Sequence, residues 1–455
     1  MARRQHQSVE RQSFLMEGSA RSLIPMGMAT LLPEASQRVR HLEATIFEGF
    51  SRWGYREIIP PTFEYLDVLS AGLPAETLEK CYKFADWTTG RILVLRPDVT
   101  AQIARIVAMG MAGQGLPLRL CYRTTVFRYE PEHAGREREV FQLGVELIGV
   151  DEASMDAEIL TLLVESLKTL GLADFKISLG HVGFYHALLA KSGMSAQGQK
   201  QAEIAAARKD LPNLEGILKS ERVPSTLARA ILEAPGRYGR EEVLEWGRKV
   251  AGRDQRLVKP IERLTQVYRL LEATGIQDHL LLDLGEFRGF DYYDGLVFDV
   301  FSGKVGCELG GGGRYNHLIG RFGRDLPSTG FALDIDRIFH ALDHVKNASN
   351  FSLSSVLLMS PLSRYGSAFK VAQFLRSQGI TVLQETLAKT TSTQNRIARQ
   401  RANESSVGWL VLAGQPRMKA QDVVAIRMGV GGKSQRTLRL EDLPDLIKKE
   451  KHASV

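Results

Sequence analysis

The segment from residue 286 to residue 337 carries residue types that could bind a small zwitterion beside a phosphate group. It reads EFRGFDYYDGLVFDV, then ELGGGGRYNHL, then TGFALDIDRI, and its candidate binding residues are Arg288, Tyr292, Tyr293, the glycines from 310 to 313 and Arg337. Arginine suits this task because its planar fork of N–H donors makes paired hydrogen bonds to carboxylates and phosphates. The same residues could run a reaction or only sense a ligand, and Asp334 bears on that choice.

Arg288 needs an anionic partner, because it stands between Phe287 and Gly289 in a segment that predicts an apolar core strand. A ligand or a buried acid could supply that partner. Side chains alternate along a strand, so only one of Tyr292 and Tyr293 is expected on the side of Arg288. The glycine run permits close approach of a ligand to the backbone, but it matches neither a GxxxxGKS phosphate loop nor a GxGxxG dinucleotide turn.

A second group of candidates lies on a predicted β-hairpin, in which LRLCYRTTVFRYE and EVFQLGVELIGV are joined by PEHAGRER. Arg128 is expected where the first strand ends, and Arg138 ends the connecting loop. Gln142 and Glu146 should share one face of the return strand, because an even number of residues separates them. The alternative interpretation is a charged hairpin tip whose arginines are solvated.

Asp98 and Thr100 lie in LRPDVT, between a predicted strand and the predicted helix AQIARIVAMGMA. A carboxylate at position 98 could hold the ammonium group of a ligand. Asp and Thr near a helix start are more often caps, and Thr100 is the expected N-cap of this helix. Considered alone, these two residues favour capping.

An α+β core must position these residues, with an antiparallel sheet flanked by helices. Helical spacing of apolar residues predicts a helix from Pro33 to Trp53, and alternating patterns around the candidates predict the strands of the sheet. A charged stretch from about 190 to 275, poor in β-branched residues, predicts a helical insertion within a core that spans residues 1–345. Strand and helix patterns alternate over residues 353–455, which predicts a small α/β domain.

The composition is that of an ordinary soluble globular protein, with 44% hydrophobic and 24% charged residues among 455. Three scattered cysteines indicate reduced thiols and neither a disulfide framework nor a metal site. No signal peptide or membrane-spanning apolar run is found, so we expect a cytoplasmic protein. Residues 353–455 hold 16 Lys and Arg against 7 Asp and Glu. This excess could dock nucleic acid, or it could be a solvated lysine-rich surface.

Together these motifs resemble the histidyl-tRNA synthetase group of the class II aminoacyl-tRNA synthetases. FRYEPEHAGREREVFQ is similar to the second class II signature, EFRGFDYY with GGGGRY to the histidine-specific signatures, and GFALDIDR to the third. The resemblance covers nearly the whole chain, and it implies a dimer with an anticodon-binding-like C-terminal domain. The group has two kinds of member. One charges tRNA with histidine. The other, the regulatory subunit of ATP phosphoribosyltransferase, does not aminoacylate and carries histidine feedback in the first step of histidine biosynthesis.

Several residues favour the regulatory kind. Asp98 lies in an RPD-x-T pattern where synthetases tend to have RPEGT, and EPEH follows Arg128 where they usually have ERPQ. Asp334 occupies a glycine position of the third signature, where its carboxylate would repel a bound triphosphate. Against this, Arg128, Arg288 and Arg337 are retained, and so is the C-terminal domain that many regulatory subunits lack. Histidyl-tRNA synthetase is therefore the alternative, and a synthetase-like RNA-binding protein is a third.

For the regulatory kind, the resemblance implies L-histidine as effector and a homodimer within a hetero-oligomer that contains a short-form catalytic subunit. It implies no catalytic residue and no cofactor, and tRNA binding is the less expected outcome. The residues expected to bind histidine are Asp98, Thr100, Arg128, Gln142, Glu146, Arg288, Tyr292 and Tyr293. A vestigial ATP site would consist of Arg138, Asp334 and Arg337.

Overall fold

The computed structural model describes residues 15–17, 24–25, 27–111, 113–129, 138–285, 292–303, 306–343, 355–387, 392–404, 407–413, 422–428 and 435–452. The chain forms two compact units, Met1–Lys346 and Asn347–Val455. None of the helices in these described ranges has the length and apolarity needed to cross a membrane.

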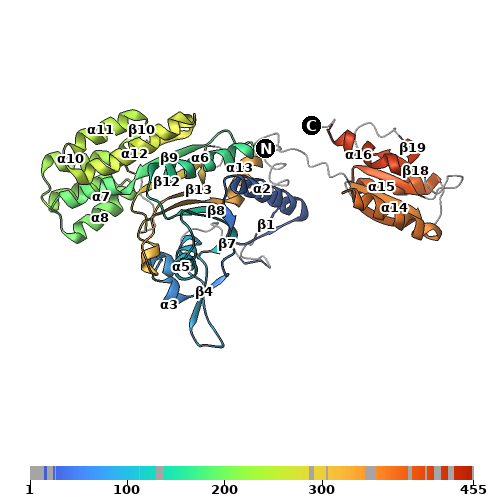
Figure 1. Cartoon of the computed structure of the whole chain (residues 1–455), viewed down its shortest axis with the longest axis horizontal. Coiled ribbons are helices and arrows are strands. Elements are labelled where there is room, and N and C mark those ends of the chain that lie inside the picture. Colours follow the sequence, from blue (N-terminus) through green and yellow to red (C-terminus); the bar gives the residue numbers. More distant parts are fainter. Residues whose placement is uncertain are drawn as a thin grey trace, which may run out of the picture. The chain divides into compact units, whose positions relative to one another are not determined.

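A nine-stranded sheet is the centre of the first unit (Figure 1). Across the sheet the strands are β10 (Tyr238–Gly239), β11 (Leu280–Asp283), β9 (Lys176–His181), β12 (Leu296–Ser302), β13 (Cys307–Arg314), β14 (Ser328–Asp334), β8 (Glu139–Ile148), β7 (Leu118–Phe127) and β3 (Arg56–Glu57). Neighbouring strands are antiparallel except for the pairs β11–β9 and β3–β7, which are parallel. The predicted antiparallel sheet is confirmed, and the strand expected through Arg288 ends earlier, at Asp283.

Helices α2 (Pro33–Arg52), α6 (Ala153–Thr169) and α13 (Ile335–Asp343) pack on one another and on one face of this sheet. The apolar stripe of α2 explains its place, because Val39, Ile46 and Phe50 recur at helical spacing and are all buried. Gly54 ends this segment with a positive φ of 82°, which glycine adopts without steric cost. The predicted helix from Pro33 to Trp53 is thereby confirmed.

The opposite face of the sheet carries α5 (Thr100–Gly110), which packs with even-numbered residues of β7 and β8 such as Leu120 and Ile148. Odd-numbered residues of β8, such as Val145, point to α2 and α6. This alternation divides the sheet into a helix-covered face and a face that is partly open. Close to the open face lies a small sheet of three strands, β4 (Phe63–Tyr65), β6 (Ile92–Leu95) and β5 (Lys83–Ala85), with helices α3 (Leu66–Leu69) and α4 (Ala75–Glu79).

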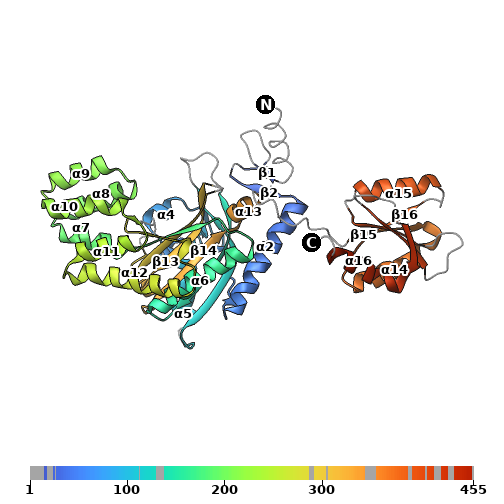
Figure 2. The ribbon, with the colours of Figure 1, turned by 90° about the horizontal axis from the view of Figure 1, so that it is seen from above.

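The predicted insertion is helical, as Figures 1 and 2 show beside β9 and β12. Its helices are α7 (Val182–Lys191), α8 (Ala196–Ala207), α9 (Leu211–Ser220), α10 (Ser225–Glu233), α11 (Glu241–Ala251) and α12 (Gln255–Ala273). Buried charges tie it to the core. Asp156 of α6 accepts hydrogen bonds from Arg263 of α12 at 2.9 Å and from Arg314 of β13 at 2.8 Å. Short elements complete the unit: β1 (Leu15–Glu17), β2 (Ala29–Leu31) and the 3₁₀ turns η1 (Ala234–Gly236), η2 (Gln277–His279) and η3 (Ile319–Arg321).

The second unit is a five-stranded sheet with helices on both faces. Its elements are β15 (Ser355–Pro361), η4 (Leu362–Arg364), α14 (Tyr365–Ser377), β16 (Thr381–Leu387), α15 (Ser392–Glu404), β17 (Trp409–Ala413), β18 (Asp422–Arg427), β19 (Gln435–Arg439), η5 (Leu440–Asp442) and α16 (Leu443–His452). The strand order is β16-β15-β17-β18-β19, with α14 and α16 against one face and α15 against the other. The predicted alternation of strand and helix is confirmed.

Candidate functional site

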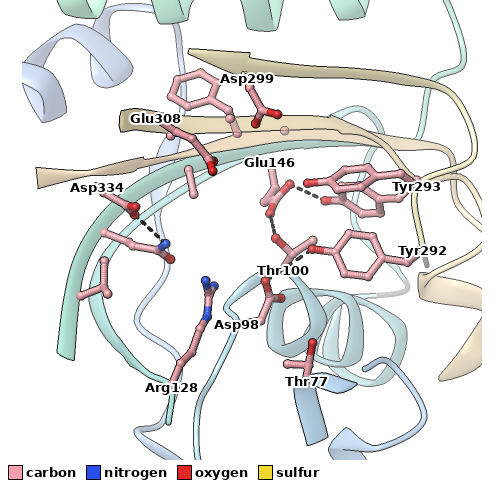
Figure 3. Close-up of a pocket in the computed structure, with 18 of the residues that line it drawn as sticks. Thr77, Asp98, Thr100, Arg128, Glu146, Tyr292, Tyr293, Asp299, Glu308 and Asp334 are labelled. Carbon is pink, nitrogen blue, oxygen red and sulfur yellow. Dashed lines mark hydrogen bonds between the residues drawn. The ribbon is translucent and has the colours of Figure 1, made fainter. Parts of the chain in front are cut away.

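A cavity of about 380 Å³ opens on the partly open face of the central sheet (Figure 3). Its described lining includes most of the residues that the sequence singles out: Asp98, Thr100, Arg128, Gln142, Glu146, Tyr292, Tyr293, Asp334 and Arg337. Arg138 lies outside this lining, with its guanidinium 4.9 Å from the ring centre of Tyr129. Arg288 falls outside the described residues.

Small residues form the floor of this cavity. One row of cross-strand partners runs from Asp299 through Gly311, Ala332 and Gly144 to Tyr122. The three residues in the middle have a methyl group or no side chain, so space remains above the sheet between an acid and a tyrosine. The glycine run therefore leaves room for the cavity, and the close packing of neighbouring strands also requires glycine there. A Cβ at position 310, where φ is +149°, would lie 2.2 Å from a carbonyl oxygen of the next strand.

Glu146 is the most deeply buried acid of the site, with 2% of its surface exposed. Its carboxylate accepts hydrogen bonds from the hydroxyls of Thr100, at 2.7 Å, and Tyr315. Gly330, its cross-strand partner, leaves room for it, since a Cβ there would lie 2.0 Å from Oε2. Burial raises the pKa of Glu146 to about 8 despite these two donors. A ligand group that hydrogen-bonds to Glu146 therefore meets a carboxyl group that can gain or lose a proton near neutral pH.

Asp98 lies below Glu146 in the view of Figure 3, with 6% of its surface exposed, and it makes two hydrogen bonds. Its Oδ1 caps helix α5 by accepting a hydrogen bond from the backbone N–H of Ala101 at 2.9 Å. Its Oδ2 accepts a longer hydrogen bond of 3.4 Å from the hydroxyl of Tyr292. Burial raises the pKa of Asp98, and a cationic ligand group would offset that burial. The expectation that Thr100 is the N-cap is wrong, because Thr100 is the first helical residue and its hydroxyl binds Glu146.

Three tyrosines enclose one end of the cavity. Tyr292 and Tyr293 both line it, with ring centres 4.8 Å apart, and Tyr315 packs against both. The expectation that Tyr292 and Tyr293 point to opposite sides is wrong, because they lie in a turn before β12 and strand alternation does not apply. Asp294 fixes this turn, since its carboxylate accepts a 2.8 Å hydrogen bond from the N–H of Asn316.

Asp334 occupies the other end of the cavity and is paired. Its Oδ1 accepts a hydrogen bond of 2.8 Å from the amide of Gln142, its cross-strand partner, and its Oδ2 forms an ion pair of 3.2 Å with Arg337. Arg337 also donates to the carbonyl of Glu308 at 3.0 Å. The guanidinium that the sequence assigns to a phosphate group is thus held by a carboxylate of the same chain.

Arg128 extends into the cavity between Asp98 and Asp334 (Figure 3). Its Nε donates a hydrogen bond of 2.8 Å to the carbonyl of Pro97, which holds the side chain in this direction. The rim nearby comes from α4 and from Lys80, which directly follows that helix and pairs with Glu76 at 2.8 Å. Arg128 therefore places its guanidinium in the cavity between the carboxylates of Asp98 and Asp334.

Several lining residues were not predicted: Glu76, Thr77, Lys80, Tyr122, Asp299, Glu308 and Tyr315. Tyr315 directly follows the GGGGR run, so its place in the motif GGGGRY was a usable signal. Asp299 and Glu308 lie in no motif that could have served as a signal, because their access to the cavity depends on strand register.

The arrangement suits recognition of an amino acid with a basic side chain. The acids Glu146 and Asp98 stand at two separate points, and the tyrosines enclose a flat space beside Glu146. Arg128 could pair with a ligand carboxylate.

The described lining contains no histidine, cysteine or serine that could act as a nucleophile. Within the described part of the chain, no three His, Cys, Asp or Glu side chains are placed to hold a metal ion.

Comparisons with known proteins show the family to which the chain belongs. A family profile for histidyl-tRNA synthetase matches residues 27–338. A protein of Geobacter metallireducens named ATP phosphoribosyltransferase regulatory subunit is 37% identical over 362 residues, which are 80% of this chain and 83% of that protein. One of the same name from Moorella thermoacetica is 38% identical over 387 residues, 85% of this chain and 97% of that protein.

A solved structure has the same architecture. It comes from Bacillus halodurans and is described as an ATP phosphoribosyltransferase regulatory subunit/histidyl-tRNA synthetase. It is 30% identical to this chain and superimposes with a TM-score of 0.73. The match covers 84% of this chain and 96% of that chain.

Proposed function

The chain belongs to the histidyl-tRNA synthetase-like family of ATP phosphoribosyltransferase regulatory subunits, and we propose that it binds free histidine and does not charge tRNA. The names of its relatives support a regulatory role in histidine biosynthesis. In this role the chain assembles with a short catalytic subunit that lacks a regulatory domain of its own, and histidine bound in the cavity controls that subunit. Control of this kind requires that histidine bind two states of the assembly with different affinities.

Histidine fits the polar groups of the cavity as follows. Glu146 accepts a hydrogen bond from the imidazole N–H, and the ring lies against the tyrosines. Asp98 and Thr100 receive the ammonium group, directly or through water. Arg128, and by resemblance Arg288, serve the carboxylate, while Gln142 completes the wall. Both buried acids then gain a cationic or N–H partner, which offsets the cost of their burial.

The observation that carries the non-catalytic assignment is the ion pair between Asp334 and Arg337 at the far end of the cavity. In a synthetase that arginine would meet ATP. Here a triphosphate would have to displace Asp334 from Arg337 and would then face the Asp334 carboxylate at close range. Two like charges a few ångströms apart in a partly buried site repel each other by several kcal/mol.

Isothermal titration with histidine tests the pocket. Arg128→Ala and Arg288→Ala should each weaken binding by roughly tenfold or more, because each removes a charge-assisted hydrogen bond. Arg321→Ala, on the η3 turn and outside the lining, is the matched control and should bind like the wild type. Unchanged affinity in both the Arg128 and the Arg288 variants would contradict the histidine assignment.

Histidyl-tRNA synthetase is the second candidate, because the arginines of the synthetase signatures are present and the C-terminal unit has the α/β fold expected of an anticodon-binding domain. Histidine-dependent exchange of pyrophosphate into ATP separates the two. Robust exchange would identify an active synthetase, whereas we expect none above background. A protein that only binds RNA through its basic C-terminal unit would instead bind tRNA with a steep salt dependence and without any effect of histidine.

A further inference from the structure

We propose that Arg96 is a positioning residue of the cavity, and that it orients Arg128 toward the carboxylate of the ligand. This inference rests on the proposed function, because that function assigns the ligand carboxylate to Arg128. Arg96 lies outside the described lining of the cavity, and only 7% of its surface is exposed. It directly follows β6 and stands two positions before Asp98.

The guanidinium of Arg96 is bound to backbone carbonyls from two different segments. Its Nε donates a hydrogen bond to the carbonyl of Thr125 on β7 at 2.6 Å. Its Nη1 donates to the carbonyls of Pro60 at 3.0 Å and Pro61 at 3.3 Å. A buried arginine usually pairs with an acid, but none of the described acids forms an ion pair with this one. The contacts of Arg96 therefore fix backbone geometry.

Three successive hydrogen bonds join Arg96 and Pro97 to the end of β7. The first is the bond from Arg96 to Thr125. In the second, the carbonyl of Arg96 accepts the N–H of Phe127 at 2.9 Å. In the third, the carbonyl of Pro97 accepts the Nε–H of Arg128 at 2.8 Å. Arg128 thus leaves β7 beside a segment that Arg96 holds through both its main chain and its side chain.

The direction of the Pro97 carbonyl follows from the position of Arg96. The proline ring fixes its own φ, and it restricts the residue before it to extended conformations. A shift of Arg96 would therefore turn the acceptor that holds Arg128. Binding groups must stay within about 0.5 Å of their productive geometry, so a loosened acceptor should weaken the contact that Arg128 makes with a ligand.

Asp98 has supports that do not depend on Arg96. Its Oδ1 accepts the N–H of Ala101 at the start of α5, and its Oδ2 accepts the hydroxyl of Tyr292. Loss of the Arg96 contacts should therefore affect the carboxylate side of the ligand, through Arg128. The ammonium side, at Asp98, should stay in place.

The small sheet β4-β6-β5 is also attached to α5 by other residues. Gln102 donates hydrogen bonds to the carbonyl of Pro61 at 2.8 Å and to Glu64 at 3.0 Å. Arg105 donates to Glu64 at 2.6 Å. Because these contacts hold the sheet, the distinct contact of Arg96 is the one with β7, the strand that leads into the cavity.

Only arginine has the donor geometry that this position uses. Its planar group carries N–H donors that point in different directions, which lets Nε and Nη1 serve separate segments. Lysine has one ammonium at the end of a flexible stem, so it keeps the charge but cannot reach both segments at once. Arg96→Lys should therefore fold and loosen the hold on Pro97.

Isothermal titration of the full chain with two ligands tests the inference. L-histidinol has a hydroxymethyl group where histidine has its carboxylate, so it does not use Arg128. Arg96→Lys should weaken histidine binding roughly fivefold and histidinol binding less than twofold. In a chain that already carries Arg128→Ala, the lysine substitution should cause no further loss of histidine affinity, because its effect passes through Arg128.

Arg105→Lys is the matched control, since it makes the same change at a part-buried arginine of the same region. It should leave the affinities for both ligands within twofold of the wild type. Circular dichroism and melting temperature report on the fold of each variant. Arg96→Gln keeps an amide donor without the charge, and it should show the same difference between histidine and histidinol if lysine destabilises the chain.

Three results would overturn the assignment. They are a histidine affinity that neither Arg96 variant changes, losses of equal size for histidine and histidinol, and an additive loss in the double variant with Arg128→Ala. A wild type that does not bind histidine would contradict the proposed function as well. Normal binding by the wild type with any of the three results would contradict the role of Arg96 alone.

Discussion

Replacing Glu146 by glutamine should weaken histidine binding and at the same time stabilise the empty protein. The two effects share one cause, which is the burial of an ionisable group that the ligand needs. Glu146 is 2% exposed, and its hydrogen-bond donors are the hydroxyls of Thr100 and Tyr315. Neither donor carries a charge, so neither fully replaces the water that a carboxylate loses on burial.

The gain in stability follows from the pKa of Glu146, which burial raises from 4.5 to about 8. At pH 7 the folded chain keeps a proton that the unfolded chain releases, a difference of about 3 kcal/mol at 1.36 kcal/mol per pH unit. Glutamine removes this cost, while rearranging the hydrogen bonds to Thr100 and Tyr315 costs about 1 kcal/mol. A net gain of about 2 kcal/mol in the free energy of unfolding remains.

The pH dependence of the free energy of unfolding tests this explanation. Since the folded state binds the proton more tightly, the wild type loses stability as the pH rises from about 4.5 to about 8. Denaturant unfolding at pH 5, 7 and 9 should therefore show the smallest gain for Glu146→Gln at pH 5 and the largest at pH 9. At pH 9, where Glu146 is ionised, histidine binding should weaken roughly 10- to 150-fold in the variant, because a hydrogen bond to a charged group contributes about 1.5–3 kcal/mol.

Glu215→Gln is the matched control, since Glu215 lies on α9 in an exposed pair with Lys219 at 2.7 Å. It should change neither quantity measurably. A Glu146→Gln protein that is less stable than the wild type at every pH, and that binds histidine equally well, would refute the reasoning.

Three further substitutions test the remaining parts of the site. Tyr315→Phe removes a hydroxyl donor to Glu146 and should weaken histidine binding about fivefold in a titration, because one hydrogen bond contributes about 1 kcal/mol; unchanged affinity would mean that Tyr315 does not orient the acid. Asp98→Asn keeps an acceptor for the N–H of Ala101, so the melting temperature should hold while histidine affinity drops tenfold or more; a lower melting temperature with unchanged affinity would assign Asp98 to capping alone. Asp334→Asn removes the carboxylate beside Arg337, so ATP binding by titration should rise while histidine affinity stays within threefold; lost histidine binding with no gain for ATP would contradict the division of the cavity.

The sequence predicted the sheet well because its strands follow their own periodicity. The even spacing of Gln142 and Glu146 in β8 places both in the cavity, and the apolar stripe of α2 places that helix against the opposite face. Such patterns are local, so they can be read without knowing the neighbouring strands.

Features that depend on distant neighbours could not be predicted. The pairing of Asp334 with Gln142 joins strands 192 positions apart in the chain, and only the register of β14 against β8 brings them together. Tyr292 and Tyr293 were expected on opposite sides because their segment was predicted as a strand, whereas they lie in a turn. Asp299 reaches the cavity only because small residues face it across β13 and β14.

The rate of the short ATP phosphoribosyltransferase catalytic subunit, measured with and without this chain, tests the central claim most directly. We predict that adding the chain raises the initial rate of phosphoribosyl-ATP formation, that histidine suppresses this gain, and that Glu146→Gln makes the suppression need at least tenfold more histidine. A catalytic subunit whose rate is indifferent to the chain, together with robust histidine-dependent pyrophosphate exchange by the chain alone, would contradict the account and identify a synthetase.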